Sequence, residues 1–115
     1  MTSDALRLRM SFGGSDPALV YRSLCGAIDA LMADGGVPMD TLERMSHGLA
    51  ELVDAIFLDA RVVSVEITSA GSALETSLTY AGSNVELDVG ATQIVHGAFD
   101  EVRQEEGLIR VRVRP

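Results

Sequence analysis

Residues 42–67 constrain the fold most, because a helical pattern runs there directly into a strand pattern. Apolar residues recur first at intervals of three and four, which predicts one apolar stripe on a helix that ends near Asp59. The stripe consists of Leu42, Met45, Leu49, Leu52 and Ile56. The next residues alternate, which predicts a strand with Val63, Val65 and Ile67 on one side. Each element buries a single side, so the chain must build layers.

Capping and turn residues divide the rest of the chain. Asp16-Pro17 predicts the start of a helix that continues to about Ala33. Asp40-Thr-Leu-Glu43 has the spacing of a capping box at the start of the second helix. Gly90 leads into a third helix, which we expect Gly107 to end. Its buried side is expected to hold Ile94, Val95, Ala98, Phe99 and Val102.

Alternating apolar residues predict the strands. The expected strands are Leu6–Phe12, Val62–Thr68, Leu74–Tyr80, Val85–Val89 and Leu108–Arg114. With the helices they give the order βααβββαβ. This order predicts one domain over residues 1–115, an α+β two-layer sandwich with a mostly antiparallel mixed sheet and three helices on one face.

Composition excludes several classes of protein. With 115 residues, 47% of them apolar and 23% charged, the chain can bury a core without a metal or disulfide. Seventeen acids against nine Arg, with no Lys, argue against nucleic acid as a partner. The N-terminus lacks a secretory pattern and the apolar runs are short, so we expect a cytoplasmic protein without a membrane partner. Cys25 is expected to be a small buried side chain.

Three short segments carry a family resemblance. They are the run Glu51-Leu-Val-Asp-Ala55 on the second helix, the run Tyr80-Ala-Gly-Ser-Asn84 after the central hairpin, and Gly90-Ala-Thr92 at the third helix. With the predicted element order, they resemble the nucleotide motifs of the GHKL, or Bergerat-type, ATP-binding fold of gyrase and sensor histidine kinases. The chain is most similar to the small anti-sigma-factor serine kinases of bacterial partner-switching pathways, and the similarity covers nearly its whole length.

The first motif of such kinases reads Glu-x-x-x-Asn. The resemblance implies that its Glu orients or deprotonates the attacking group, and that the Asn oxygen completes a Mg²⁺ shell. The matching residues are Glu51 and Ala55, and a methyl group cannot coordinate a metal. A shift by one residue would place Asp54 on the Asn position, but Ala50 would then replace the Glu. We therefore treat Glu51 as a catalytic relic or a solvated acid.

The other two motifs are also incomplete. In the second motif, Gly82 fits the first glycine, but Tyr80 stands where an Asp reads adenine and Asn84 replaces the second glycine. Tyr80 is a plug for the vacated pocket, an ordinary strand aromatic, or both. The glycine-rich lid is reduced to Gly90. We expect no nucleotide cofactor, no metal and no catalytic residue.

Two His residues carry little chemical signal. His47 stands in a segment with a faint similarity to the phosphoacceptor box of sensor kinases, but its helix leads directly into a sheet. We expect an exposed or hydrogen-bonded side chain without a catalytic role there. His96 has no Cys or second His near it in sequence, so a metal site is not expected.

Five Arg lie on the first and last predicted strands, at alternating positions. They are Arg7, Arg9, Arg110, Arg112 and Arg114. On one open sheet face they would repel one another unless strand acids lie between them or an acidic partner docks. Pairing with strand acids such as Glu66, Glu75, Glu86 or Asp88 is the simpler expectation, and a basic docking stripe for protein is the alternative.

These observations predict a non-catalytic, protein-binding regulatory module related to anti-sigma-factor kinases, acting in bacterial partner switching or two-component-type signalling. A homodimer is among the expected assemblies. Two alternatives stay open: a divergent ATP-binding serine/threonine kinase that acts as an anti-sigma factor, and a small-molecule sensor that uses the vacated nucleotide pocket.

Overall fold

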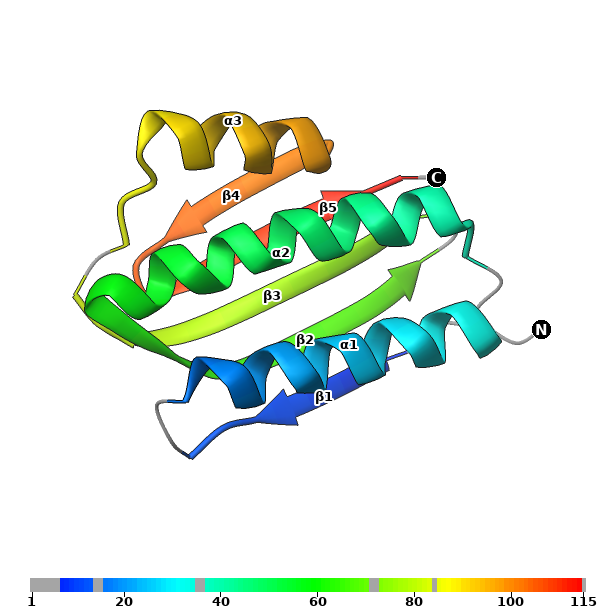
Figure 1. Cartoon of the computed structure of the whole chain (residues 1–115), viewed down its shortest axis with the longest axis horizontal. Helices are drawn as coiled ribbons and strands as arrows, with labels where there is room; N and C mark the ends of the chain where they lie inside the picture. Colours follow the sequence, from blue (N-terminus) through cyan, green and yellow to red (C-terminus); the bar gives the residue numbers. More distant parts are fainter. Residues whose placement is uncertain (1–6, 14–15, 35–36, 71–72, 84, 115) are drawn as a thin grey trace.

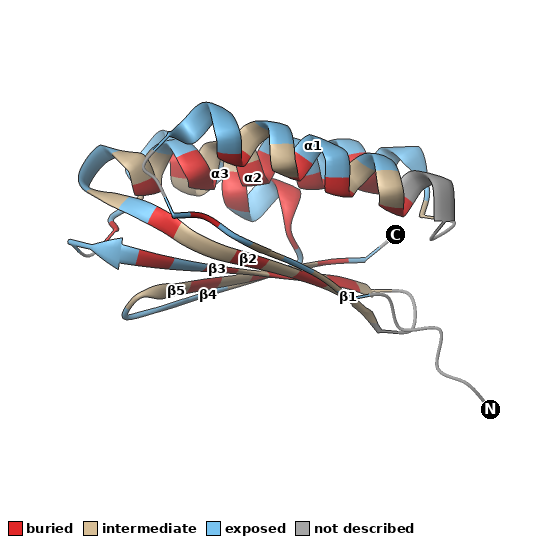
Figure 2. Cartoon of the chain, turned by 90° about the horizontal axis from the view of Figure 1, so that it is seen from below, coloured by how far each residue is buried: buried red, intermediate tan, exposed pale blue. Residues whose placement is uncertain are grey.

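The computed structural model describes residues 7–13, 16–34, 37–70, 73–83 and 85–114, which form two layers (Figure 1). The helices are α1, Pro17–Asp34, α2, Met39–Asp59, and α3, Val89–Ala98. The strands are β1, Arg7–Ser11, β2, Ala60–Ala70, β3, Ala73–Gly82, β4, Glu101–Glu105, and β5, Leu108–Val113. Figure 2 shows that α1, α2 and α3 lie on the same face of the sheet and leave its other face open.

The sheet has the strand order β1-β2-β3-β5-β4, with β5 inserted between β3 and β4. Every neighbouring pair in the described part is antiparallel, so the sheet is not mixed. The predicted α+β class, a two-layer sandwich with the helices on one sheet face, is confirmed.

The element order is βααββαββ and not the predicted βααβββαβ, partly because α3 is shorter than expected. It ends at Ala98, and the next residues turn onto the sheet as β4. Phe99 and Val102 both face the core, so their spacing of three fits a turn and strand as well as a helix. Gly107, predicted to end the helix, has a φ of 76° in the hairpin between β4 and β5, where glycine adopts the left-handed region without strain.

The predicted strand Val85–Val89 does not form. Val85 is buried and Leu87 is partly buried in a loop that packs against the core, whereas Val89 begins α3 with 77% of its surface exposed. The alternation in this segment therefore comes from a loop that inserts single apolar side chains into the core.

An irregularity in β2 changes which valine is buried. The pairing of β2 with β3 shifts between Val62 and Ser64, which leaves one extra residue on β2. Val62, Val65 and Ile67 are consequently buried, and Val63, which we predicted on their side, is partly exposed. On β3 the predicted inner set of Leu74, Thr76, Leu78 and Tyr80 is confirmed as buried.

The two long helices begin differently. At α1 the Asp16 carboxylate accepts the amide of Ala18 at 2.9 Å, as the cap prediction requires. The predicted capping box at Asp40 is wrong, because α2 begins at Met39 after Pro38 and has no side-chain cap hydrogen bond. Asp40 instead lies in the first turn, where its negative charge interacts favourably with the positive end of the helix dipole.

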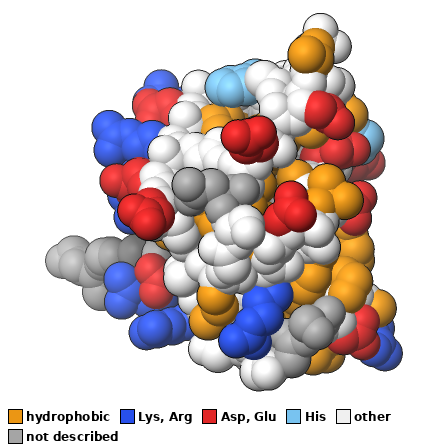
Figure 3. Space-filling view, turned by 90° about the vertical axis from the view of Figure 1, so that its left-hand side faces the viewer, with side chains coloured by type: hydrophobic (Ala, Val, Ile, Leu, Met, Phe, Trp, Pro, Cys, Tyr) orange, Lys and Arg blue, Asp and Glu red, His pale blue; other side chains and the backbone are white. Residues whose placement is uncertain are grey.

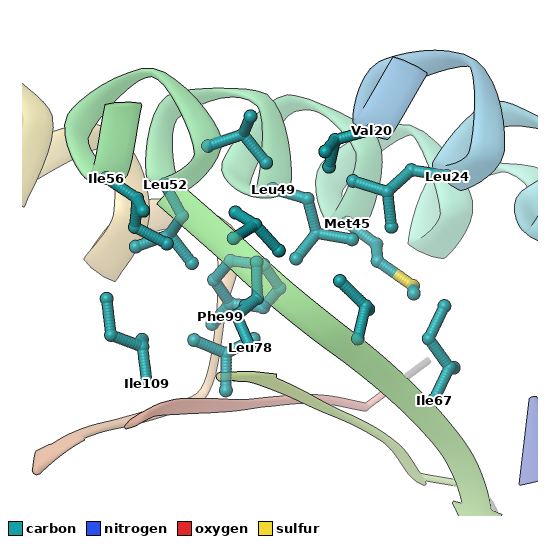
Figure 4. Packing of buried hydrophobic residues seen from close by; sticks show 14 of the residues in the cluster. Val20, Leu24, Met45, Leu49, Leu52, Ile56, Ile67, Leu78, Phe99 and Ile109 are labelled. Atoms are coloured by element: carbon teal, nitrogen blue, oxygen red, sulfur yellow. The ribbon is translucent and has the colours of Figure 1, made fainter. Parts of the chain in front are cut away.

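The core lies between the helices and the sheet (Figure 4). The predicted stripe of α2 is buried throughout, and it faces apolar residues of the sheet such as Leu78 and Ile109. Burial of each such side chain contributes roughly 1.5–3 kcal/mol relative to exposure. One cluster includes buried residues of all three helices, which holds the layers together.

At Gly48, α2 packs closely against the end of α3. A Cβ atom at this position would lie 2.4 Å from Cε2 of Phe99 and 2.8 Å from the Cβ of Ala98. Phe99 is itself buried, with its ring under α2 (Figure 4). Any larger residue at position 48 must therefore move the ring or the helix.

We expect Gly48→Ala to lower the free energy of unfolding by about 1–2 kcal/mol, because overpacking outweighs the better helix propensity of Ala. Gly26→Ala is the matched control on α1, where nothing lies within 4 Å of the added methyl group. That variant should gain about 0.5–1 kcal/mol. Urea unfolding followed by circular dichroism measures both, and equal gains would contradict the close contact.

Candidate functional site

The residues assigned to the first nucleotide motif lie in the second half of α2. Glu51 and Ala55 are one helical turn apart and half-buried, and Ala55 packs against the core. Asp54 is directed toward α1, because its carboxylate accepts a hydrogen bond from the phenol of Tyr21. The alternative register, with Asp54 as a metal ligand, therefore uses a carboxylate that already holds two helices together.

Tyr21 joins α1 to α2 through its hydroxyl group. The hydroxyl donates to Asp54, and the carbonyl oxygen of Ala50 is a second acceptor at 3.2 Å. Burial raises the pKa of Tyr21 above its ordinary value of 10.0, and the hydrogen bond and charge of Asp54, followed by the charge of Glu51, raise the pKa further. Asp54 and Glu51 of α2 thus favour the neutral form of Tyr21, which joins α1 to α2.

Tyr80 is a core residue of β3 at the position where the resemblance requires an adenine-reading carboxylate. It is buried, and its hydroxyl donates to the carbonyl oxygen of Glu105 at 3.4 Å. Its main-chain amide donates to the carbonyl of Gly107 at 3.0 Å. Tyr80 therefore anchors the β4–β5 hairpin, as an inward-facing strand aromatic. It also lines a cavity of about 360 Å³ with Gln104, Glu105 and Glu106.

The two glycines that the resemblance assigns to the second and third motifs have different roles. Gly82 has a φ of 127°, and a Cβ there would lie 2.8 Å from the Cα of Ala60. The open end of the β2–β3 hairpin, where Gly82 pairs with Ala60, therefore requires a glycine at position 82, whether or not a nucleotide binds. Gly90 is exposed, and an added Cβ would meet only an Asp88 oxygen at 3.5 Å, an ordinary contact. Asn84 lies outside the described residues.

The N-terminus of α3 is occupied by its own cap. The Asp88 carboxylate accepts the amide of Ala91 at 2.7 Å. Free amides at a helix N-terminus bind phosphate, but a carboxylate there takes one of the donors and repels a second anion. Gly90 thus belongs to a capped helix start.

The residues that the resemblance assigns to Mg-nucleotide do not fit that ligand. Ala55 offers no oxygen, Asp54 binds Tyr21, and Asp88 places negative charge at the start of α3. The layer between α2 and the sheet is filled by side chains that include Phe99, Leu52 and Leu78 (Figure 4). The side-chain chemistry of these residues and the packing of the layer therefore both disfavour Mg-nucleotide as a ligand here.

The open face of the sheet carries charged residues in two rows that run across all five strands. The register defines the first row as Arg7, Thr68, Glu75, Arg112 and Glu101. It defines the second row as Arg9, Glu66, Ser77, Arg110 and Arg103. The rows contain five of the nine Arg of the chain but only three of its 17 acids. Figure 3, viewed from one end, shows Arg and carboxylate side chains together on the sheet side.

The acids of the first row are paired with Arg112 of the same row and with Arg110 of the second row. Arg112 donates to Glu75 at 3.0 Å and lies 3.9 Å from Glu101, so this guanidinium bridges two carboxylates. Arg110 lies 3.6 Å from Glu75 and donates to Ser77 at 3.4 Å. This is the expected pairing with strand acids, and such half-exposed pairs contribute about 0–1 kcal/mol each. Glu86 and Asp88, which we also expected among these acids, lie instead in the segment before α3, where no strand forms.

The second row contains an Arg that the sequence pattern missed. Arg103 is directly opposite Arg110 in the register, and a like-charge pair of this kind costs roughly 0.2–1 kcal/mol. It was overlooked because residues 101–105 were expected to continue the third helix. The usable signal is Glu106-Gly107, a two-residue turn between two alternating segments.

The remaining predicted Arg lie at the margins of this face. Arg7 lies 3.9 Å from Glu66 and is largely exposed, and Arg9 is opposite the same acid in the register. Arg114 follows β5. Its amide donates to Asp100 at 2.6 Å, and its carbonyl oxygen accepts Arg44 at 2.7 Å. Arg114 is therefore held by its main chain, apart from the two rows.

Cys25 and the two His residues lie at the surface of the protein. Cys25 is exposed, so the prediction of a buried side chain is wrong; it lies beside the buried stripe of α1 and not within it. His47 and His96 are also exposed. In the part of the chain that the structure describes, no group of three or more His, Cys, Asp or Glu could hold a metal ion.

No protein-family model matches this sequence, and no curated protein matches it. None of the described helices combines the length and hydrophobicity that a bilayer crossing requires.

The raised pKa of Tyr21 gives a prediction for alkaline stability. The folded chain keeps the phenol proton where the unfolded chain loses it, so the stabilisation is complete below pH 10.0 and declines as pH rises further. Tyr21→Phe should cost about 0.5–1.5 kcal/mol at neutral pH and flatten the decline above pH 10.0. Urea unfolding across this pH range measures both effects, and parallel curves for the two proteins would contradict the assignment.

Proposed function

We propose that this chain is a non-catalytic regulatory module that binds protein. In this proposal it is a degenerate relative of the anti-sigma-factor serine kinases and acts in the cytoplasm, in bacterial partner switching or two-component-type signalling. One observation carries the proposal: where Mg-nucleotide would need oxygen ligands and free amides, α2 offers a methyl group at Ala55 and α3 is capped by Asp88. Loss of the ligand site with retention of the fold leaves the surface as the functional part.

The open sheet face is the surface that best fits a partner. It concentrates Arg in a chain whose net charge is −8, and no helix covers it. Of the candidate contacts, Arg110 and Arg112 are central, and Arg7 and Arg9 lie toward the β1 edge. Arg114 lies beyond the end of β5. A second copy of the chain is one partner that this face could take.

A small-molecule sensor is the second candidate, and the cavity beside Tyr80 favours it. Gln104, Glu105 and Glu106 give this cavity polar and acidic walls, which suit a small cation-bearing metabolite better than a nucleotide phosphate. Native mass spectrometry of the purified chain would reveal such a ligand as an added mass. A divergent kinase is the third candidate, and nucleotide binding tests it directly.

We expect millimolar Mg-ATP to leave the thermal unfolding midpoint of the chain unchanged, because a ligand stabilises a protein only when it binds the folded state. Ala55→Asn restores the missing oxygen but leaves the Asp88 cap in place, so it should not respond either. Differential scanning fluorimetry with and without nucleotide makes the measurement. A rise of several degrees in the wild type would reject the non-catalytic function and favour the kinase.

Charge reversal tests the sheet face. Arg110→Glu with Arg112→Glu should abolish capture of partner protein in a pull-down from the native cell, because it turns a basic surface acidic. The reversal also places new acids beside Glu75 and Glu101, so circular dichroism must show that the variant is folded. Arg22→Glu on α1 is the matched control. Undiminished capture by the folded double variant would place the interface elsewhere.

A further inference from the structure

Arg103 of β4 and Arg110 of β5 form an opposed pair of cations on the open sheet face. Directly opposed like charges weaken an antiparallel pair, so this arrangement opposes folding. Within the described residues, Arg103 has no hydrogen bond or ion pair that would offset the repulsion. The fold thus keeps two cations side by side without an acid between them.

Two acids that line the same face are already engaged by other contacts. Glu75 lies 3.0 Å from Arg112 and 3.6 Å from the Nε of Arg110. Glu101 lies 3.9 Å from Arg112. The two terminal nitrogens of Arg110 and the whole guanidinium of Arg103 are left without an acceptor in the part of the chain that the structure describes. These N–H groups are free for an external anion.

A shallow cavity lies at this pair. Its volume is about 350 Å³, and it is lined by Glu75, Glu101, Arg103, Arg110, Val111 and Arg112. Three Arg against two Glu leave one positive charge in the lining. One anionic group would neutralise that charge.

The geometry points to a binding site for the carboxylate of a single acidic side chain in a partner protein, an inference that rests on the proposed protein-binding function. Guanidinium groups bind carboxylates through two parallel N–H···O bonds. Arg103 and Arg110 present such donors from adjacent strands, so a carboxylate between them accepts hydrogen bonds from both and removes their repulsion.

The acidic residues around the Arg pair determine which charges a partner segment can carry next to its acid. Glu101 and Glu105 lie two positions to either side of Arg103 on the same face of β4. An extended partner segment that places an acid at Arg103 therefore meets acids at both flanking positions, where bases bind and acids are repelled. With a net charge of −8, the chain also repels a continuous polyanion such as nucleic acid. The partner segment is an acid flanked by bases.

Three short synthetic peptides test this chemistry on the full chain. Their centres are Lys-Val-Glu-Val-Lys, Lys-Val-Gln-Val-Lys and Glu-Val-Glu-Val-Glu. We expect the acid-centred basic peptide to bind about fivefold more tightly than its Gln counterpart, the factor that an exposed ion pair of about 1 kcal/mol provides. The peptide with three acids should bind more weakly than the first. Affinity is measured by titration calorimetry, and perturbed Arg Nε–H resonances in NMR spectra locate the site.

Two variants separate binding from folding. Arg103→Gln should abolish the preference for the Glu-centred peptide, while its thermal unfolding midpoint stays the same or rises by roughly 1–3 °C because the repulsion is lost. Arg22→Gln, an exposed Arg on α1, should keep the wild-type preference. A structural role for Arg103 would lower the midpoint and thereby overturn the inference.

The remaining outcomes also decide the question. Equal affinity for the Glu and Gln peptides, or tightest binding of the peptide with three acids, would overturn the inference. Retention of the preference in Arg103→Gln would do the same. If a protein partner is still captured in those cases, the proposed function stands and only this site is wrong. A response of the wild type to Mg-ATP rejects the proposed function without affecting the peptide result.

Discussion

The close packing of α2 on α3 at Gly48 is the contact on which the rest of the structure depends. It seats the ring of Phe99 under α2, where it fills the layer above Leu78 and the sheet. Next to this contact, α3 ends at Ala98 and the chain returns to the sheet as β4. A residue without a side chain at position 48 thus lets the Phe99 ring fill the interlayer space just before the strand that carries Arg103.

The segments with regular apolar spacing predicted the two layers correctly, because the spacing of apolar residues in them follows from which side of the element is buried. The stripe through Leu49 and Ile56 and the inner residues of β3 are examples. The errors fall where two structures share one spacing. Phe99 and Val102 fit a helix as well as a turn and strand, and Val62 replaces Val63 in the core through a bulge that no local propensity signals. Such choices are made by tertiary packing.

Some features of the candidate site could likewise be predicted from the sequence, and others needed the structure. The sequence alone shows that the side chain of Ala55 offers no metal ligand, because the inability of a methyl group to bind a metal does not depend on the fold. The engagement of Asp54 by Tyr21 and the cap at Asp88 depend on contacts between and within elements and needed the structure. Arg103 was missed for a similar reason: its face is defined only once α3 ends and β4 begins.

The place of β5 has a consequence for biosynthesis. It is made after every other described strand, yet it lies inside the sheet between β3 and β4. On the ribosome, β1, β2 and β3 can therefore associate while β3 still presents an unpaired edge. Free edges of this kind recruit strands from other molecules. The nascent chain is most prone to aggregate in that interval, and docking of the C-terminal hairpin closes it.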